Sequence, residues 1–238
     1  MNLILLHPKD FTDSDTVHLN DRRFQHLRSV NKAEVGQTFK AGIVNGNLGR
    51  ATVIHMDDKG ITLSTQLDQA PPKPLPVTLL LAMPRPKMLK RTLETIATMG
   101  VKHLILINSY RVDKSYWSTP LLSDQAVAEF LTLGLEQAGD TLMPKVEIKK
   151  RFKPFVEDEL PALMQNKTGW VAHPYNAEPC PPAADTPTLL AIGPEGGFIK
   201  YEVDKLQAAG LTPIHLGSRI LRVETAVPVL LSRLFPIF

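Results

Sequence analysis

Two glycine-containing segments near the carboxyl end carry the residues best suited to chemistry. The first follows an apolar stretch ending at Ile192, and it reads Gly193-Pro194-Glu195-Gly196-Gly197. Adjacent glycines permit positive φ angles and leave no Cβ between the backbone and a ligand, so their amides and carbonyls can recognise the edge of a flat heterocycle. The helix predicted from Lys200 directs its N-terminus toward the same place. An ordinary tight turn between a strand and a helix is the alternative interpretation.

The second segment follows a predicted strand over residues 212–216 and combines glycine, arginine and apolar residues. It reads Leu216-Gly217-Ser218-Arg219-Ile220-Leu221-Arg222-Val223-Glu224-Thr225-Ala226. The two arginines are either solvated surface charges or fixed positive charge beside an apolar pocket, where an anionic substrate would dock. Ligands bind beyond the carboxyl ends of strands in open parallel sheets, so this segment, the glycine turn and His173 should lie together.

Several kinds of site are excluded because their motifs are missing. The chain has no G-x-x-x-x-G-K-[ST] phosphate loop, no G-x-G-x-x-G after the first strand of its second block, and no G-x-S-x-G elbow. The seven histidines lack metal-ligand spacing, so we expect no metal. The single cysteine, Cys180, excludes an internal disulfide framework.

The elements that must position these residues fall into two blocks. Residues 1–70 hold short apolar stretches separated by turn signals such as Asn45-Gly46, which predicts a small β-barrel. A proline-rich linker follows at 71–76. Residues 77–238 alternate apolar strands with helices, which predicts an α/β fold around a mostly parallel sheet. The predicted strands are 77–83, 103–107, 146–148, 169–173, 188–192 and 212–216; the predicted helices are 87–100, 123–138, 155–165, 200–209 and 224–234.

Composition limits the setting of the molecule. The chain has 238 residues, of which 43% are hydrophobic and 21% charged, as in globular proteins. No stretch approaches the ~18 apolar residues of a membrane span, and the first residues lack the basic region of a signal peptide, so we expect a cytoplasmic protein. A net charge of +3 permits a polyanionic partner without requiring one.

Taken together, the two late segments resemble the RsmE family, the 16S ribosomal RNA uridine-N3 methyltransferases of the SPOUT superfamily. Earlier segments are similar to the same family in the same order: His26-Leu27-Arg28-Ser29-Val30 near the start, and Leu135-Glu136-Gln137-Ala138-Gly139 in the middle. The resemblance therefore extends along the whole chain.

The resemblance implies a fold, a cofactor and partners. It implies a SPOUT-type α/β knot, which is a deep trefoil knot, behind an N-terminal PUA-like β-barrel that binds RNA. It also implies a homodimer that methylates N3 of a uridine in 16S rRNA, uridine 1498 in ribosomal numbering. The implied cofactor is S-adenosyl-L-methionine (SAM), and the residues expected to bind it are His173, Ile192, Gly193, Pro194, Glu195, Gly196, Gly197, Leu216, Gly217, Ser218, Ile220, Leu221, Arg222, Thr225 and Ala226.

Methylation of uracil N3 defines the catalytic roles to be filled. The N3–H group must lose a proton, and the resulting charge spreads to O2 and O4, where an arginine can stabilise it. Arg222 is the first candidate for that arginine, and Arg219 is the second. A carboxylate can accept the proton, and Glu195 and Glu224 are the candidates. Glu224 can equally be a carboxylate favoured by the positive end of the last helix.

RNA binding requires cations, and the chain offers them in both blocks. The candidates are Arg22, Arg23, Arg28, Lys32, Arg85, Lys87, Lys90, Arg91 and Arg219.

The substrate end departs from the family pattern, which keeps other functions open. Where the family usually reads V-L-R, this chain has Val30-Asn31-Lys32; S-E-R becomes Ser109-Tyr110-Arg111; and the arginine that usually ends E-Q-x-G-R is Asp140. The alternatives are a SPOUT methyltransferase acting on another RNA, including a ribose 2′-O-methyltransferase, a non-catalytic RNA-binding or ribosome-assembly factor, and an enzyme acting on free nucleotides.

Overall fold

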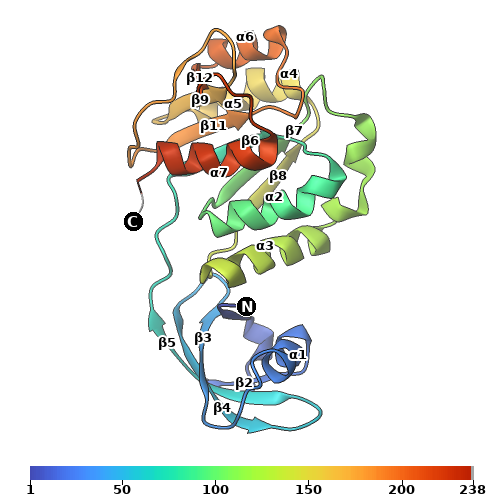
Figure 1. Cartoon of the computed structure of the whole chain (residues 1–238), viewed down its shortest axis with the longest axis vertical. Coiled ribbons are helices and arrows are strands. Elements are labelled where there is room, and N and C mark those ends of the chain that lie inside the picture. Colours follow the sequence, from blue (N-terminus) through green and yellow to red (C-terminus); the bar gives the residue numbers. More distant parts are fainter. Residues whose placement is uncertain (237–238) are drawn as a thin grey trace. The chain divides into compact units, whose positions relative to one another are not determined.

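The chain divides into two compact units, seen in a computed structural model that describes residues 1–236. Unit 1 comprises Met1–Lys73 and Leu131–Met143, and unit 2 comprises Pro74–Phe130 and Pro144–Phe238 (Figure 1). Ile237 and Phe238, the last residues of the predicted second domain, lie outside the described residues. The break after Lys73 falls inside the predicted linker, but Leu131–Met143 belongs to unit 1 although it lies far beyond that linker.

Unit 1 is built on a five-stranded sheet in the order β1-β3-β4-β5-β2. β1 runs parallel to β3, and the other pairs are antiparallel. Alternate residues of β4 and β5 are buried at the start of the strands, as expected for a sheet with one face on a core. The strands are β1 (Ile4–Leu6), β2 (Thr16–Leu19), β3 (Thr38–Ile43), β4 (Leu48–Met56) and β5 (Ile61–Gln69).

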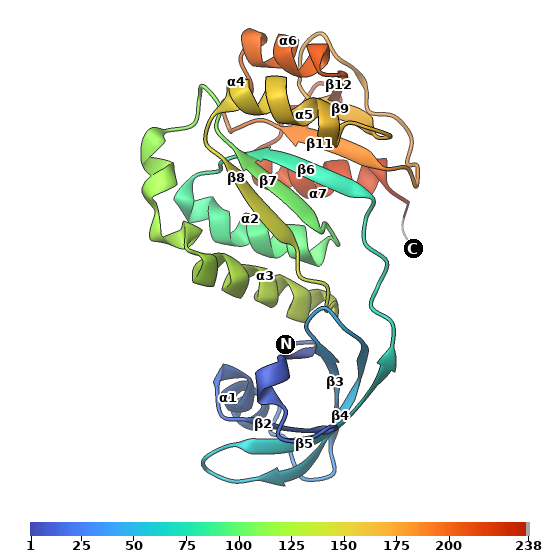
Figure 2. The ribbon, with the colours of Figure 1, turned by 180° about the vertical axis from the view of Figure 1, so that it is seen from behind.

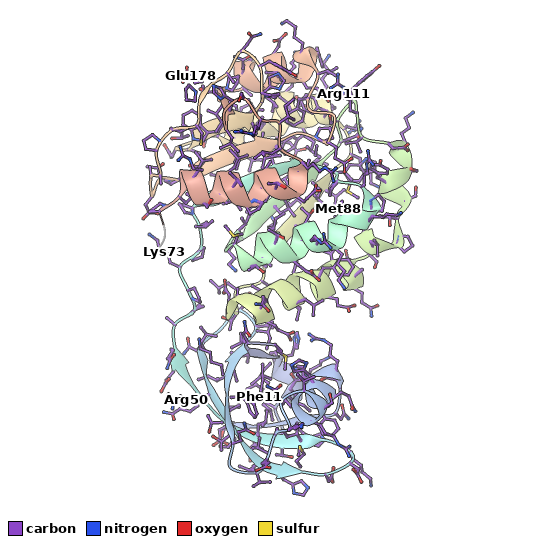
Figure 3. All side chains as sticks on the ribbon, viewed as in Figure 1. Phe11, Arg50, Lys73, Met88, Arg111 and Glu178 are labelled. Carbon is purple, nitrogen blue, oxygen red and sulfur yellow. The ribbon has the colours of Figure 1, made fainter. Side chains whose placement is uncertain are left out.

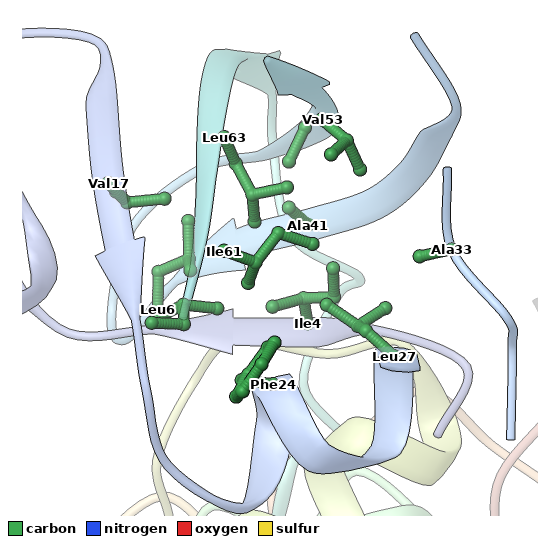
Figure 4. Packing of buried hydrophobic residues seen from close by; sticks show 12 residues of the cluster. Ile4, Leu6, Val17, Phe24, Leu27, Ala33, Ala41, Val53, Ile61 and Leu63 are labelled. Atoms are coloured by element: carbon green, nitrogen blue, oxygen red, sulfur yellow. The ribbon is translucent and has the colours of Figure 1, made fainter. Parts of the chain in front are cut away.

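The core of unit 1 lies between this sheet and one short helix, α1 (Arg22–Ser29) (Figure 4). Phe24 and Leu27 of the helix are almost fully buried with Leu6, Ile61 and Leu63 of the strands. Asp21 caps the start of this helix, because its carboxylate accepts a hydrogen bond from the Arg23 amide.

Arg23 is buried in unit 1, which contradicts its prediction as an RNA-binding residue. It is only 4% exposed. Its guanidinium lies 2.6 Å from the Asp10 carboxylate and 2.7 Å from that of Asp21, and it also donates to the Leu5 carbonyl. These partners occupy the guanidinium, so Arg23 stabilises the fold instead of facing an RNA.

Unit 2 is built on a seven-stranded sheet in the order β10-β12-β9-β11-β6-β7-β8, in which every adjacent pair is parallel. The prediction of an α/β fold with a mostly parallel sheet is confirmed. The central strands β6 and β11 are buried along their entire length, which explains their continuous apolar sequences. The strands are β6 (Val77–Ala82), β7 (His103–Ile107), β8 (Lys145–Lys149), β9 (Thr168–Ala172), β10 (Glu178–Pro179), β11 (Thr188–Ile192) and β12 (Leu211–His215).

Helices cover both faces of this sheet. α2 and α7 lie side by side on one face, and the α4–α5 region lies on the other (Figures 1 and 2). The helices are α2 (Pro86–Thr98), α3 (Asp124–Ala138), α4 (Phe152–Pro154), α5 (Leu160–Leu163), α6 (Lys200–Ala208) and α7 (Val223–Leu234). Short 3₁₀ turns occur at η1 (Pro8–Asp10), η2 (Lys114–Ser118) and η3 (Pro120–Leu122).

The helix predicted over 155–165 has a different form in the structure. It begins at Phe152, passes through a π-helical turn, η4 (Phe155–Glu159), and ends at Leu163. Pro161 has no N–H group and cannot donate a hydrogen bond to the preceding turn. The Leu160 amide, just before it, donates to the carbonyl of Phe155, five residues back, which is the π-helical spacing.

Candidate functional site

A pocket of about 450 Å³ opens at the carboxyl ends of β9, β11 and β12 in unit 2. Its walls are the segments that follow these three strands, together with the first turns of α7. The predicted meeting of the glycine turn, the 216–226 segment and His173 is therefore present in the structure. The lining residues are Arg111, Ala172, His173, Pro174, Tyr175, Ile192, Gly193, Pro194, Glu195, Gly196, Gly197, Ile214, His215, Leu216, Gly217, Arg219, Ile220, Leu221, Val223, Ala226 and Leu230.

Most residues expected to bind a cofactor lie in this lining, and three do not. Ser218, Arg222 and Thr225 are absent from it, and all three are exposed. The walls are mainly apolar, with Ile192, Leu216, Ile220 and Leu221 among them.

The sequence predicts positive φ angles at the two adjacent glycines of the turn, and one of the two has such an angle. Gly197 adopts a φ of +73°, and the open space beside it would receive a Cβ if one were present. Its amide donates to the Pro194 carbonyl at 2.7 Å. Gly196 does not have a positive φ; a Cβ there would lie 2.9 Å from Cδ of Arg111. A side chain at Gly196 would therefore displace the Arg111 side chain, whereas a Cβ at Gly197 would meet no protein atom.

Arg111 is a pocket residue that the sequence reasoning did not select. It lies on the loop that follows β7 (Figure 3), and its guanidinium donates to the Gly196 carbonyl. The available signal was the arginine retained in Ser109-Tyr110-Arg111, where the family reads S-E-R. Tyr175 and His215, near the ends of strands, and Leu230, within α7, were also missed, since apolar and aromatic residues there do not distinguish a pocket from a core.

His173 presents a neutral imidazole to the pocket. Burial lowers the pKa of His173 below its ordinary value of 6.5, because desolvation penalises the charged ring. Its Nδ1 is buried and has no hydrogen-bond partner among the described residues. The ring also makes an edge contact with Tyr175, with the centroids 6.0 Å apart. A buried polar atom without a partner is what a ligand-binding group presents before its ligand arrives.

The three catalytic candidates occupy different positions. Glu195 lines the pocket and forms an ion pair with Arg85. Arg222 caps the start of α7, where its carbonyl accepts hydrogen bonds from Thr225 and Ala226. Glu224 lies in the first turn of α7, outside the pocket lining. Only Glu195 of the three therefore lines the pocket, and Arg219 is the arginine of the 216–226 segment that does.

The remaining basic candidates lie on the surface of their own units. Lys87, Lys90 and Arg91 are exposed on α2. In unit 1, Arg28 pairs with Asp58 at 2.7 Å, and Arg22 makes a two-bond contact with Glu136 at 2.8 and 2.9 Å. Lys32 is exposed.

Two kinds of site are absent from the part of the chain that the structure describes. No cluster of histidine, cysteine, aspartate or glutamate among residues 1–236 could hold a metal ion. Among the described helices, none combines the length and apolar character that a membrane crossing requires.

Fold and site together define a class of protein. The chain is an α/β protein with a parallel sheet, and its apolar, glycine-bordered pocket lies at the carboxyl ends of the strands, where such proteins bind small ligands. The family model for the RNA methyltransferase domain matches residues 71–235, so the chain belongs to that family.

Comparisons along the whole chain agree. The chain is 28% identical over 232 residues to the ribosomal RNA small subunit methyltransferase E of Treponema pallidum, covering 95% of this chain and 87% of the relative. It is 25% identical to ribosomal RNA small subunit methyltransferase E 1 of Borreliella burgdorferi, covering 95% and 94%. The resemblance to the RsmE family is confirmed by these relatives.

A solved structure shows the same fold. The ribosomal RNA small subunit methyltransferase E of Neisseria gonorrhoeae, bound to S-adenosyl methionine, superposes with a TM-score of 0.73 at 20% identity, covering 98% of this chain and 95% of that one.

Proposed function

We propose that this protein is a SAM-dependent methyltransferase that modifies the RNA of the small ribosomal subunit. The observation that carries the proposal is the pocket in unit 2, because it joins apolar walls, a glycine turn and an unpartnered imidazole nitrogen at the carboxyl ends of three parallel strands. The names of the Treponema and Borreliella relatives support the rRNA substrate.

The residues present fit SAM. Ile192, Leu216 and Leu221 offer apolar surface for an adenine ring, and the glycine turn offers backbone groups for its edges. The open space at Gly197 and the buried Nδ1 of His173 supply room and a polar partner. When bound, SAM supplies an electrophilic methyl group, so the protein's main task is to align the acceptor with it.

Within this function, we propose uridine N3 as the acceptor, as the RsmE resemblance implies. The carboxylate of Glu195 would accept the N3 proton, after its ion pair with Arg85 opens. Arg222 remains the first candidate to stabilise the negative charge that develops on O2 and O4, and Arg219, which lines the pocket, is the second.

RNA binding would draw on the exposed cations of each unit. On unit 2 these are Arg85 and the exposed face of α2, with Lys87, Lys90 and Arg91. On unit 1 they are Lys32 and the paired Arg22 and Arg28. The trefoil knot, the PUA-like character of unit 1, the homodimer and a cytoplasmic location with the ribosome complete the proposal.

Transfer of labelled methyl groups tests the function directly. Purified protein and labelled SAM would be incubated with small ribosomal subunits, free rRNA and tRNA from a strain that lacks this protein. We expect label in small-subunit RNA, recovered as N3-methyluridine in nucleoside mass spectrometry. SAM binding without transfer to any RNA would indicate a non-catalytic RNA-binding protein, and a methylated ribose would identify a 2′-O-methyltransferase.

A further inference from the structure

A buried carboxylate outside the pocket, that of Glu202, joins two segments that border it. Glu202 lies in the first turn of α6 and is only 3% exposed. Its carboxylate accepts three hydrogen bonds: from the Ile199 amide at 3.0 Å, from the Tyr110 amide at 2.7 Å and from the Ser109 hydroxyl at 3.1 Å. A carboxylate that only capped α6 would need the first of these bonds. The other two come from the loop that follows β7.

That loop continues directly into Arg111, which contacts the glycine turn. The Arg111 guanidinium donates to the Gly196 carbonyl, and its aliphatic part occupies the space that a Cβ at Gly196 would need. Arg111 lines the pocket and also an adjoining hollow of about 410 Å³ beside α6. It therefore forms part of the wall between the two hollows.

The carboxyl side of the glycine turn is consequently held at two points by bonds that lead to one carboxylate. At Gly196, Arg111 fixes the carbonyl, and Arg111 follows the two residues that Glu202 binds. At its end, the turn runs through Phe198 into Ile199, whose amide Glu202 also binds. An ordered turn spends no binding free energy on becoming ordered when a ligand arrives.

We infer that Glu202 is a positioning residue for the cofactor pocket: through Ser109 and Tyr110 it holds Arg111 against Gly196 and so keeps the glycine turn in its binding conformation. This inference rests on the proposed binding of SAM in that pocket. Glu202 does not line the pocket, whereas Arg111 does, so Glu202 acts on the pocket through Arg111.

Substitution of Glu202 by glutamine separates the hydrogen bonding of the carboxylate from the volume of the side chain. Glutamine has the same shape but only one acceptor oxygen. With that oxygen on Ile199 and Ser109, which share one carboxylate oxygen in the wild type, the N–H₂ group faces the Tyr110 amide and cannot accept from it. In Glu202→Gln we expect SAM affinity, measured by calorimetry, to fall on the order of tenfold. Hydrogen exchange of the Tyr110 and Gly197 amides in the free protein should become faster. The matched control is Glu157→Gln, because the exposed Glu157 carboxylate also pairs with α6, at Lys205, at a distance of 2.6 Å. This control should change neither the SAM affinity nor the exchange rates.

A double-mutant cycle with Arg111→Ala tests whether Glu202 acts through Arg111. If it does, Arg111→Ala and Glu202→Gln each weaken SAM binding and speed Gly197 exchange, and the double variant is no worse than Arg111→Ala alone. Additive effects of the two substitutions would overturn the inference and leave Glu202 as a structural cap of α6. If Glu202→Gln does not fold, Ser109→Ala takes its place in the cycle, because it removes one of the two loop contacts.

SAM binding by the wild-type protein distinguishes a failure of the proposed function from a failure of the positioning role. Wild-type protein that does not bind SAM would refute the proposed function. Wild-type protein that binds SAM, with Glu202→Gln equal to it in affinity and in Gly197 exchange, would refute the positioning role alone.

Discussion

At the scale of single residues, Gly196 and Gly197 have different reasons to lack a side chain. Gly196 makes room for Arg111, whereas Gly197 lines the pocket and combines a positive φ with open space beside it. Of the two positions, Gly197 is therefore the one where a small side chain would meet no other protein atom.

Gly197→Ala should weaken SAM binding more than tenfold, because it adds a methyl group at a residue that lines the pocket and strains its backbone by about 1–2 kcal/mol. The matched control is Gly36→Ala in unit 1, which also has a positive φ, +87°, and nothing within 4 Å of the added Cβ. Calorimetry with SAM should show wild-type affinity for Gly36→Ala. Equal affinities for the two variants would mean that the turn does not border the ligand.

The two arginines of the 216–226 segment differ in position, because Arg219 lines the pocket and Arg222 does not. Arg222→Ala should lower single-turnover methyl transfer roughly 10²-fold, as for loss of a group that stabilises developing charge. SAM affinity should stay near wild type, because Arg222 lies outside the pocket lining. Wild-type transfer by Arg222→Ala, together with a large loss for Arg219→Ala, would transfer the role to Arg219.

At the scale of elements, the junction of η1 and α1 depends on one buried guanidinium. Arg23 binds Asp10 of η1 and Asp21 at the start of α1. Burial alone would raise the pKa of Asp10, but hydrogen bonds from Arg23 and the His7 amide, with the Arg23 charge, hold it below its ordinary value of 3.8. Asp21 is affected by Arg23 in the same direction. Such carboxylates stabilise the folded state above their ordinary pKa.

Arg23→Met should therefore lower the free energy of unfolding of unit 1 by about 3–5 kcal/mol at pH 7, since it leaves the Asp10 charge buried and unpaired. The stabilisation by a lowered carboxyl pKa is lost as the pH falls through the folded value, so the difference from wild type should narrow below pH 3.8. Hydrogen exchange of the unit 1 strands reports the change. Arg28→Met is the control, because its exposed pair with Asp58 contributes less than about 1 kcal/mol. A constant difference across pH would exclude the linkage to Asp10.

Periodicity predicted most elements, and long-range contacts account for what it missed. The strands β6, β7 and β11 were predicted within a residue or two, because a short continuous apolar run bounded by turn residues is typical of a strand buried in a parallel sheet. β1 and the two-residue β10 were not predicted, because short segments carry no period and exist only through pairing with β3 and β12. Arg111 was missed for the same reason: it meets Gly196 across 85 positions of sequence, and no local pattern records that contact.

At the scale of the whole molecule, unit 1 is built from two separate segments of the chain, and the residues before the linker form only the first of them. The segment Leu131–Met143 belongs to unit 1, although the sequence predicts a domain that ends at residue 70. Its backbone accepts hydrogen bonds from the N-terminal strand region, at the Glu136 carbonyl from Asn2 and Leu3 at 3.2 and 3.1 Å. The Glu136 side chain is 3% exposed and binds Arg22 through both oxygens. The hairpin between β3 and β4 is held by Thr141, whose hydroxyl donates to the Gly46 carbonyl at 2.5 Å.

A fragment of residues 1–73 should consequently be less stable than unit 1 in the intact chain. It loses the acceptors for Asn2, Leu3 and Asn45 and leaves the Arg22 guanidinium without its carboxylate. We expect its urea midpoint, followed by circular dichroism, to lie below that of unit 1 in the full chain, followed by hydrogen exchange. A synthetic peptide of residues 131–143 should raise that midpoint. Equal midpoints without the peptide would show that the first 73 residues fold independently of it.

The same contact can be tested in the intact chain, where both tryptophans, Trp117 and Trp170, lie in unit 2 and report its unfolding separately. Glu136→Gln replaces one of the two oxygens that face Arg22 with a donor, so a charge-assisted bond becomes a donor–donor repulsion. Unit 1 should lose about 1–3 kcal/mol of unfolding free energy, measured by hydrogen exchange, while the tryptophan fluorescence transition stays in place. Glu129→Gln, exposed on the same helix α3, is the matched control and should leave both transitions unchanged. A tryptophan transition that moves with Glu136→Gln by as much as that of unit 1 would contradict this prediction and show that the two units unfold as one.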